Sequence, residues 1–283
     1  MKKRKWFELS SAKLHIIAML LMLCDHLWAN FFLSERWMTS VGRIAFPIFA
    51  FMIAEGFFRT SNRWKYIRRM AIFAFISEIP FNLGVEHALI YPYHQNVLFT
   101  FLLGMFAMML IEKVRTGLQR KLSKQILSVI FTVVIAILIT LVFFLLGMIT
   151  FVDYYGFGVA AVIVFYLSHT QNLENLFGGL VKEDFRSTKA YGVIIQLISM
   201  VLQVVLLYQI FDGLGGYYFT VNIFGFEVEV VEELLALFAL PIIWLYRGKK
   251  GYSAKWFQYF NYAFYPAHLF IIYLVTLVVS HFS

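Results

Sequence analysis

The sequence predicts an all-α bundle of transmembrane helices, about nine in number, with the N-terminus in the cytoplasm, and three observations predict it. Hydrophobic residues make up 61% of the 283 residues and charged residues only 14%, against roughly 45–50% and about 25% in a soluble domain. Many apolar runs reach the roughly 18 residues that can cross a bilayer. Basic residues gather in alternate connecting segments, as the positive-inside rule describes. No polar stretch is long enough for a second core, so we expect one membrane domain over residues 1–283.

Each predicted span is an apolar run bounded by polar or basic residues. The first follows a basic N-terminus, but it is longer than the apolar core of a signal peptide and lacks a small-x-small cleavage site, so we retain it. The third and fourth are short and end in polar clusters. The expected spans are Leu14–Phe32, Val41–Phe58, Tyr66–Leu83, Asn96–Ile111, Ile126–Met148, Asp153–Ser168, Tyr191–Phe211, Val228–Tyr246 and Phe260–Phe282.

The distribution of lysine and arginine predicts the orientation. Of the 24 basic residues, 22 lie before the first span, in every second connection or, as Arg68 and Arg69 do, in the adjoining first turn of the third span, whereas Arg36 lies in an opposite loop and Arg43 deeper within a span. The positive-inside rule then places the N-terminus in the cytoplasm and, with an odd number of spans, the C-terminus outside. Topology therefore explains the net charge of +8, and we expect no nucleic-acid partner.

Two further features limit the function. The single cysteine, Cys24, excludes an internal disulfide and offers no spacing for a zinc site, so we expect no metal. The segment Asp212–Glu227 mixes glycine with aromatic residues and reads as an extracytoplasmic lid or short hairpin.

Ionisable residues inside spans are costly, so each is a candidate functional residue. At 1.5 Å per residue, Asp25 and His26 lie about 17–18 Å from the cytoplasmic start of the first span. By the same rise His268 lies about 12 Å from the inner face, near enough in depth to meet His26. In the outer half we expect these substrate-binding residues: Arg43, Glu78, Asn82, Gln95, Asn96 and Asp153.

His26 is the best candidate for a general base, because histidine can take a proton from an attacking amine or hydroxyl near neutral pH. Asp25 either orients His26 or pairs with Arg43, since neighbouring helix residues point about 100° apart. Both residues also fit a role in interhelical hydrogen bonds. His268 follows a turn that we expect Pro266 to loosen, and it fits either a catalytic or a core histidine.

Each of the other polar residues also has more than one possible role. Arg43 could bind a carboxylate, a phosphate or a thioester carbonyl oxygen, or extend to the outer headgroups. Glu78 could be a second carboxylate, pair with Arg43 or cap a helix break at Pro80. Four cytoplasmic basic residues could hold a phosphorylated donor, although lipid headgroups and topology explain them too: Arg59, Arg63, Arg247 and Lys249.

Several motifs together resemble the TraX family, in order along nearly the whole chain. They are Met22–His26 (MLCDH), Gly42–Phe51 (GRIAFPIFAF), Ala54–Thr60 (AEGFFRT), Ile76–Phe81 (ISEIPF), Gln95–Val97 (QNV), Asp153–Gly156 (DYYG), Ala239–Pro241 (ALP) and Tyr265–His268 (YPAH). That family is named for acetylation of the N-terminal amine of F-pilin. The resemblance implies an integral-membrane acetyltransferase, in a bacterial cell membrane, that takes acetyl-CoA from the cytoplasm.

We therefore expect acetyl transfer to an extracytoplasmic amine or hydroxyl on a pilin, a peptide or a glycan. His26 is the expected base, Asp25 its partner, Arg43 the group that binds acceptor charge or the oxyanion, and His268 a secondary acid/base or acyl carrier. Direct transfer and an acyl-histidine intermediate both remain open. The alternative from another class is a proton-coupled transporter or flippase that uses the same charged residues.

Overall fold

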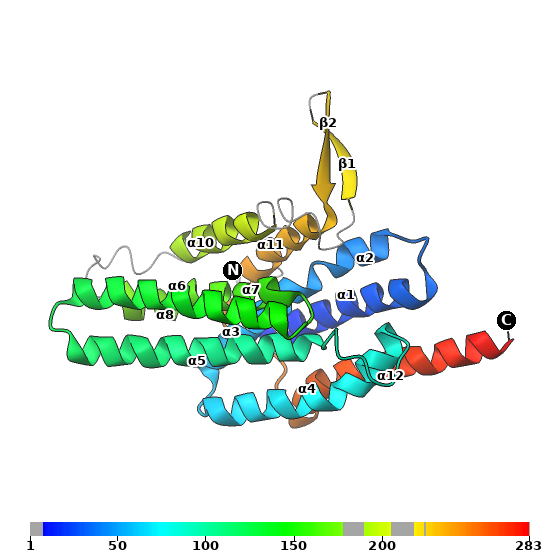
Figure 1. Cartoon of the computed structure of the whole chain (residues 1–283), viewed down its shortest axis with the longest axis horizontal. Coiled ribbons are helices and arrows are strands. Elements are labelled where there is room, and N and C mark those ends of the chain that lie inside the picture. Colours follow the sequence, from blue (N-terminus) through cyan, green and yellow to red (C-terminus); the bar gives the residue numbers. More distant parts are fainter. Residues whose placement is uncertain (1–7, 178–189, 205–217, 224, 283) are drawn as a thin grey trace, which may run out of the picture. The chain divides into compact units, whose positions relative to one another are not determined.

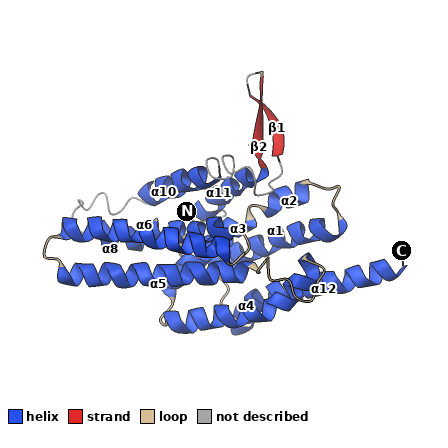
Figure 2. Ribbon diagram, in the orientation of Figure 1, coloured by secondary structure: helices blue, strands red, loops and turns tan. Residues whose placement is uncertain are grey.

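The computed structural model describes residues 8–177, 190–204, 218–223 and 225–282, and the chain in these ranges is mainly helical (Figure 2). The elements follow one another along the chain as labelled in Figure 1. They are α1 (Ser11–Phe31), α2 (Trp37–Gly42), α3 (Ala45–Arg59), α4 (Arg63–Val85), α5 (Val97–Lys121), α6 (Gln125–Ile149), α7 (Tyr155–Leu167), α8 (Thr170–Phe177), α10 (Ala190–Val201), β1 (Tyr218–Ile223), β2 (Phe226–Val231), the 3₁₀ helix η2 (Glu232–Phe238), α11 (Ala239–Trp244) and α12 (Lys255–Phe282).

Polar side chains mark where the long helices begin. Ser10 caps α1 by accepting a hydrogen bond from the Lys13 backbone N–H, and Asn96 caps α5 by accepting one from Leu98 N–H at 3.0 Å. Such caps satisfy backbone donors that the first helical turn leaves without a partner. At the other end of α5, Arg120 and Lys121 lie in the last turn, where cations complement the helix dipole.

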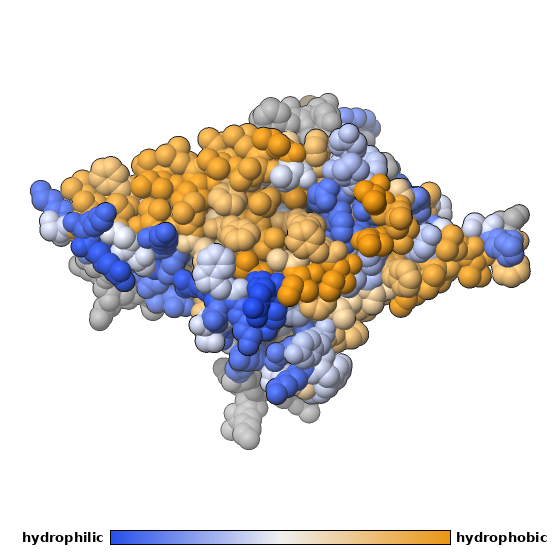
Figure 3. Space-filling view, turned by 60° about the horizontal axis from the view of Figure 1, so that its bottom comes forward, coloured by the Kyte–Doolittle hydropathy of each residue, from blue (hydrophilic) through white to orange (hydrophobic). Residues whose placement is uncertain are grey.

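In the part of the chain that the structure describes, five helical segments are long and apolar enough to cross a membrane: Ser11–Phe31, Trp37–Arg59, Val97–Lys121, Gln125–Ile149 and Lys255–Phe282. They match the first, second, fourth, fifth and ninth predicted spans. On α6, Ile137 and Ile149 are 62% and 69% exposed, as lipid-facing side chains are. Figure 3 shows apolar side chains over a broad part of the face drawn. The chain is a helical membrane protein.

The other predicted spans depart from this pattern. α4 is long enough, but it carries several basic residues in its first half, and Pro80 lies inside the helix instead of breaking it. α5 runs on to Lys121, well past the expected end at Ile111, so the fourth helix is not short. α7 has only 13 residues. The seventh span, Tyr191–Phe211, begins in α10 and ends outside the described residues.

The eighth predicted span, Val228–Tyr246, is wrong as a continuous α-helix. Its first residues belong to β2, its middle forms η2, and only Ala239–Trp244 is α-helical. The physical reason is the alternation of apolar and acidic residues from Phe226 to Val230, which suits a strand. The hairpin expected within Asp212–Glu227 is present as β1 and β2, although residues 212–217 lie outside the described ranges.

The chain divides into two compact units, each built from separate stretches of sequence. The first comprises Met1–Phe49, Ile79–Ile90 and Leu197–Ser283, and the second comprises Ala50–Glu78 and Tyr91–Gln196. In the first unit α1 packs against α2 and α12, and η2 packs against α2 and α11.

In the second unit α5, α6 and α7 pack together closely. A Cβ atom at Gly104 would lie 2.6 Å from Val162, and one at Gly147 would lie 2.9 Å from Gly156. Only a residue without a side chain allows these backbones to approach so closely. The large side chain of Tyr166 is fully buried in this unit.

Candidate functional site

The first unit brings His26 and His268 into contact. Backbone hydrogen bonds join Leu9 N–H to Leu245 O and Ser11 N–H to Lys249 O, at 3.0 and 2.9 Å, so the start of α1 is tied to the chain that leads into α12. From the starts of α1 and α12, the two histidines lie about 22 and 20 Å along their helices. The predicted meeting in depth is confirmed, because His26 Nδ1 lies 2.6 Å from His268 Nε2.

The hydrogen bonds of His268 define the tautomer of the pair. His268 Nδ1 lies 2.7 Å from the Phe264 backbone oxygen, which only accepts, so Nδ1 carries a hydrogen. In the neutral ring Nε2 is then an acceptor, and His26 Nδ1 must be the donor. The two ring planes are 8° apart, a geometry that is compatible with a hydrogen bond in the plane of both rings. This hydrogen-bond pattern leaves the lone pair of neutral His26 on Nε2.

Burial separates the roles that the two rings can take. His268 is 6% exposed and lies between His26 and Phe264, whose ring centroid is 4.9 Å from that of His268. His26 is only half-buried. The more accessible ring therefore holds the basic nitrogen, and the buried ring orients it. Pro266 lies inside an unbroken α12, so the turn before His268 lacks one backbone N–H donor without interrupting the helix.

Asp25 pairs with Arg43, one of the alternatives that the sequence left open. Arg43 Nη2 lies 3.2 Å from Asp25 Oδ1 and donates to Thr39 Oγ1 at 2.8 Å. Gly42 makes this pairing possible, since a Cβ there would lie 2.5 Å from Asp25 Cβ. Both charged side chains are about one-fifth exposed, at 20% and 23%. Asp25 thus compensates the charge of Arg43 beside the histidine pair.

A second acidic residue contacts α2. Glu232 opens η2, is 4% exposed and accepts a short hydrogen bond from Ser40 Oγ. Arg36, at the start of α2, lies 4.0 Å from the same carboxylate. The sequence pattern did not mark Glu232 as a site residue, and its contact attaches the hairpin strand β2 to α2.

The other predicted outer residues form two local pairs and one buried amide. In the second unit the Glu78 carboxylate accepts from Asn96 Nδ2 at 2.5 Å and from its backbone N–H at 3.3 Å. Glu78 therefore supports the cap of α5. Asn82 belongs to the first unit and is 3% exposed. The structure does not bring these residues into one described site with His26.

Gln95 and Asp153 hold together the loops before α5 and α7. Gln95 N–H donates to Phe151 O and Asp153 N–H to Gln95 O, both at 2.8 Å, while His94 Nε2 lies 3.5 Å from Asp153 Oδ1. Gln95 Nε2 also donates to Pro92 O at 2.9 Å. These contacts stabilise the connecting segments that lead into α5 and α7.

The four residues expected to bind the donor lie in different units, and three of them form ion pairs. In the second unit Arg59 pairs with Glu55, and Arg63 lies 3.5 Å from Glu112 and over the ring of Phe57. In the first unit Lys249 pairs with Glu8 at 2.9 Å, and Arg247 is exposed. A phosphate at Arg59, Arg63 or Lys249 has to compete with a carboxylate.

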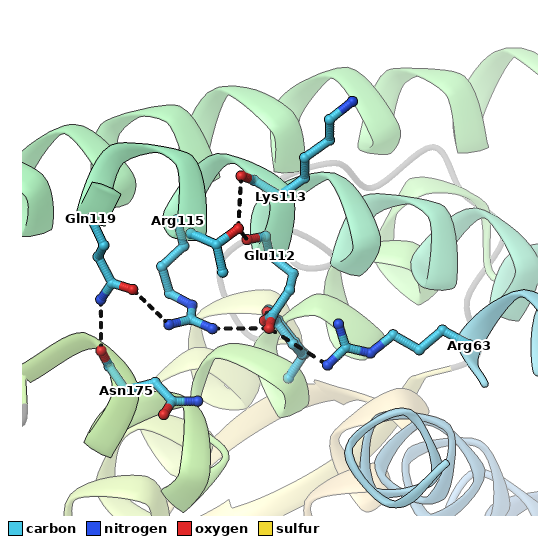
Figure 4. A network of polar contacts seen from close by, with 8 residues as sticks. Arg63, Glu112, Lys113, Arg115, Gln119 and Asn175 are labelled. Carbon is cyan, nitrogen blue, oxygen red and sulfur yellow. Dashed lines mark hydrogen bonds and ion pairs between the residues drawn. The ribbon is translucent and has the colours of Figure 1, made fainter. Parts of the chain in front are cut away.

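The sequence did not reveal a polar network around Glu112 in the second unit (Figure 4). Its carboxylate accepts from Tyr166 Oη at 2.7 Å and from Arg115 at 2.9 Å, and Arg115 is 6% exposed and also donates to Gln119. The signal available was the spacing of Glu112 and Arg115, three residues apart on one helix face.

Glu55 also has a partner that the sequence did not reveal. His169 Nε2 lies 2.9 Å from Glu55 Oε2, and the His169 ring stacks on Phe58 with centroids 4.1 Å apart. His169 Nδ1 accepts from the Gln171 N–H in the first turn of α8 at 3.2 Å, so this histidine joins α3 to α8. Among the described residues no group of three or more His, Cys, Asp and Glu side chains gathers as metal ligands do.

Comparison with known proteins identifies the family of this chain. The family model described as "TraX protein" matches residues 10–181 and 187–276. The "probable fimbrial assembly protein FimC, serogroup H1" of Dichelobacter nodosus is 31% identical over 115 residues, which are 36% of this chain and 47% of that protein. This chain therefore spans about half the length of that relative. No solved structure matches. Because the family model covers most of the sequence, including both histidines, the chain belongs to the TraX family.

Proposed function

We propose that the protein is a membrane acetyltransferase that moves an acetyl group from acetyl-CoA to an amine or hydroxyl of an extracytoplasmic acceptor. The observation that carries the proposal is the 2.6 Å contact between His26 Nδ1 and His268 Nε2. This contact leaves His26 with its basic nitrogen on the more accessible side of the pair. A histidine held in this way, at depth in a membrane protein, matches the requirement for a general base in acyl transfer.

The reaction follows from that arrangement. His26 Nε2 takes the proton of the acceptor N–H or O–H while the acceptor attacks the thioester carbonyl carbon. As the new bond to carbon forms, the carbonyl oxygen gains negative charge, and we assign its stabilisation to the guanidinium of Arg43, which pairs with Asp25, the residue before His26. The carbon–sulfur bond then breaks, and the proton passes from His26 to the departing thiolate. Direct transfer needs no covalent enzyme intermediate.

Two further considerations support an acceptor connected with surface fibres. The chain belongs to the TraX family, and a relative over part of its length is named for fimbrial assembly. A pilin or a similar peptide offers an N-terminal amine, which is nucleophilic once it loses a proton. A glycan hydroxyl is the other acceptor class for the same chemistry.

The test measures acetyl transfer per folded molecule in purified protein. His26→Ala should lower transfer from acetyl-CoA by about 10²–10⁴-fold, the loss expected when a positioned proton acceptor is removed. Acetyl-CoA binding should persist in the variant, because the change leaves the cytoplasmic basic residues intact. His281→Ala is the matched control, since His281 is an exposed histidine near the end of α12.

Two outcomes would overturn the proposal. Near-normal turnover in folded His26→Ala would remove its catalytic role and leave the histidine pair as an interhelical contact. Absence of acetyl-CoA binding in folded wild-type protein, together with proton-dependent flux of a solute in vesicles, would instead indicate a transporter.

A further inference from the structure

The β1–β2 hairpin has one apolar face and one polar face. Its strands are antiparallel, with Thr220 opposite Glu229 and Val221 opposite Val228. Directly opposed residues share a face, and successive residues alternate between faces. The apolar face therefore includes Phe219, Val221, Phe226, Val228 and Val230, and the polar face includes Thr220, Asn222, Glu227 and Glu229, with Tyr218 and the buried Val231 at its base.

The apolar face is open to its surroundings in the part of the chain that the structure describes. Phe226 is 76% exposed, Val228 40% and Phe219 36%. A two-stranded hairpin is only marginally stable alone in water and needs its apolar face covered. Some component outside the described residues must therefore cover these side chains.

The base of the hairpin lies toward the C-terminal end of α1. β2 continues directly into Glu232, which contacts Ser40 on α2 and Arg36 before it. α2 follows the C-terminal end of α1, the end that the distribution of basic residues predicts to be outside. Figure 1 shows the strands running across the direction of α1 instead of along it. If α1 crosses the bilayer, strands with this direction extend along the membrane surface.

We propose that the hairpin lies on the outer surface of the bilayer, with Phe219, Phe226 and Val228 inserted at the lipid interface. Phenylalanine and aliphatic residues form the apolar side of amphipathic segments that lie at this depth, with that side in lipid and the charged side in water. The carboxylates of Glu227 and Glu229 then face water. Leu33 and Trp37, in and after the loop between α1 and α2, are also exposed, at 66% and 59%. The proposal is independent of acetyl transfer.

The experiment compares two faces of one hairpin in the full chain. Cys24 is the single cysteine, so a Cys24→Ser background accepts one spin label at a chosen position. The paired variants are Phe226→Cys with Glu227→Cys, and Val228→Cys with Glu229→Cys. In phosphatidylcholine nanodiscs, collision of the label with oxygen, which concentrates in lipid, is compared with collision with a water-soluble nickel chelate.

We expect the ratio of oxygen to nickel collisions to be several-fold higher at positions 226 and 228 than at 227 and 229. Two pairs are used so that one badly folded variant does not decide the result. Equal ratios on both faces would overturn the proposal. Labels at 226 and 228 that are shielded from both reagents, and become accessible on dilution, would also overturn it and indicate a second copy of the chain.

Discussion

At the scale of single residues, the chemistry depends on which nitrogen of each histidine carries hydrogen. The Phe264 carbonyl determines this for His268, and His268 determines it for His26. Sequence could predict that the two residues meet, because depth in a membrane follows from helix rise. It could not predict the tautomer, because that depends on the rotation of each ring toward one acceptor.

This arrangement separates two roles that the sequence left open for His268. If His268 only positions His26, His268→Gln should retain most of the transfer activity, because its side-chain oxygen can accept from His26 Nδ1–H. His268→Ala should lose about 10–100-fold, as is typical when the group that orients a histidine is removed. Turnover per folded molecule measures both, with His281→Ala as the control.

Equal losses in the two His268 variants would contradict the positioning role. They would mean that His268 itself exchanges protons or carries the acyl group, because glutamine can do neither. A trapped acetyl group at residue 268, found by mass spectrometry of protein quenched with acid, would identify the acyl carrier directly.

The partner of Asp25 is set by the direction of its side chain and not by its neighbour in the sequence. Consecutive helix residues point about 100° apart, so a sequence neighbour of His26 is not thereby its spatial partner. The prediction that Asp25 could pair with Arg43 is confirmed at 3.2 Å. Glu78, in contrast, accepts from Asn96, and nothing in the spacing of these residues identified that partner.

At the scale of elements, Gly42 sets how closely α1 and α2 approach. Gly42→Ala would place a Cβ 2.5 Å from Asp25 Cβ, an atom that cannot move away without its helix. We expect a loss of about 1–3 kcal/mol, the usual cost of overpacking. Thermal unfolding in detergent, followed by helical circular dichroism, measures the change.

The matched control is Gly117→Ala in α5, where a Cβ would meet no atom within 4 Å. Alanine stabilises an open helical position relative to glycine by up to about 1 kcal/mol, so this variant should be unchanged or slightly more stable. If Gly42→Ala were as stable as Gly117→Ala, the described separation of α1 and α2 would be wrong.

Hydropathy predicted long apolar helices well and short mixed elements poorly. The mean hydropathy of Val228–Tyr246 is the same whether these residues form a strand, a 3₁₀ helix or an α-helix. The local sequence FEVEV at Phe226–Val230 has the alternation of a strand, and it was the signal that could have corrected the eighth span. Pro80 and Pro266 lie within continuous α4 and α12, so proline alone did not mark a helix end.

At the scale of the whole molecule, the segment from Glu232 to Leu245 connects the two ends of α1 despite its irregular structure. Glu232 contacts α2, which follows the C-terminal end of α1, whereas Leu245 is bonded to Leu9 just before the start of α1. A 3₁₀ helix rises about 2.0 Å per residue and an α-helix 1.5 Å, so η2 and α11 together extend about 23 Å. Since the 21 residues of α1 extend about 31 Å, η2 and α11 cover about three-quarters of that length.

This connection predicts the orientation of the C-terminus. The loop Arg247–Lys250 should be cytoplasmic, because it is basic and lies beside the start of α1, and α12 should then end outside. Reporter fusions after Phe32 and after Ser283 should both register as external, and a reporter inserted after Lys249 should register as internal. The insertion after Lys249 decides whether the irregular segment crosses, because it tests that segment separately from α12.

An external signal at Lys249 together with an internal C-terminus would show that Glu232–Leu245 does not cross the membrane. The hairpin and the loop would then lie on one side, and the bonds between Leu9 and Leu245 could not form in a chain whose N-terminus is cytoplasmic.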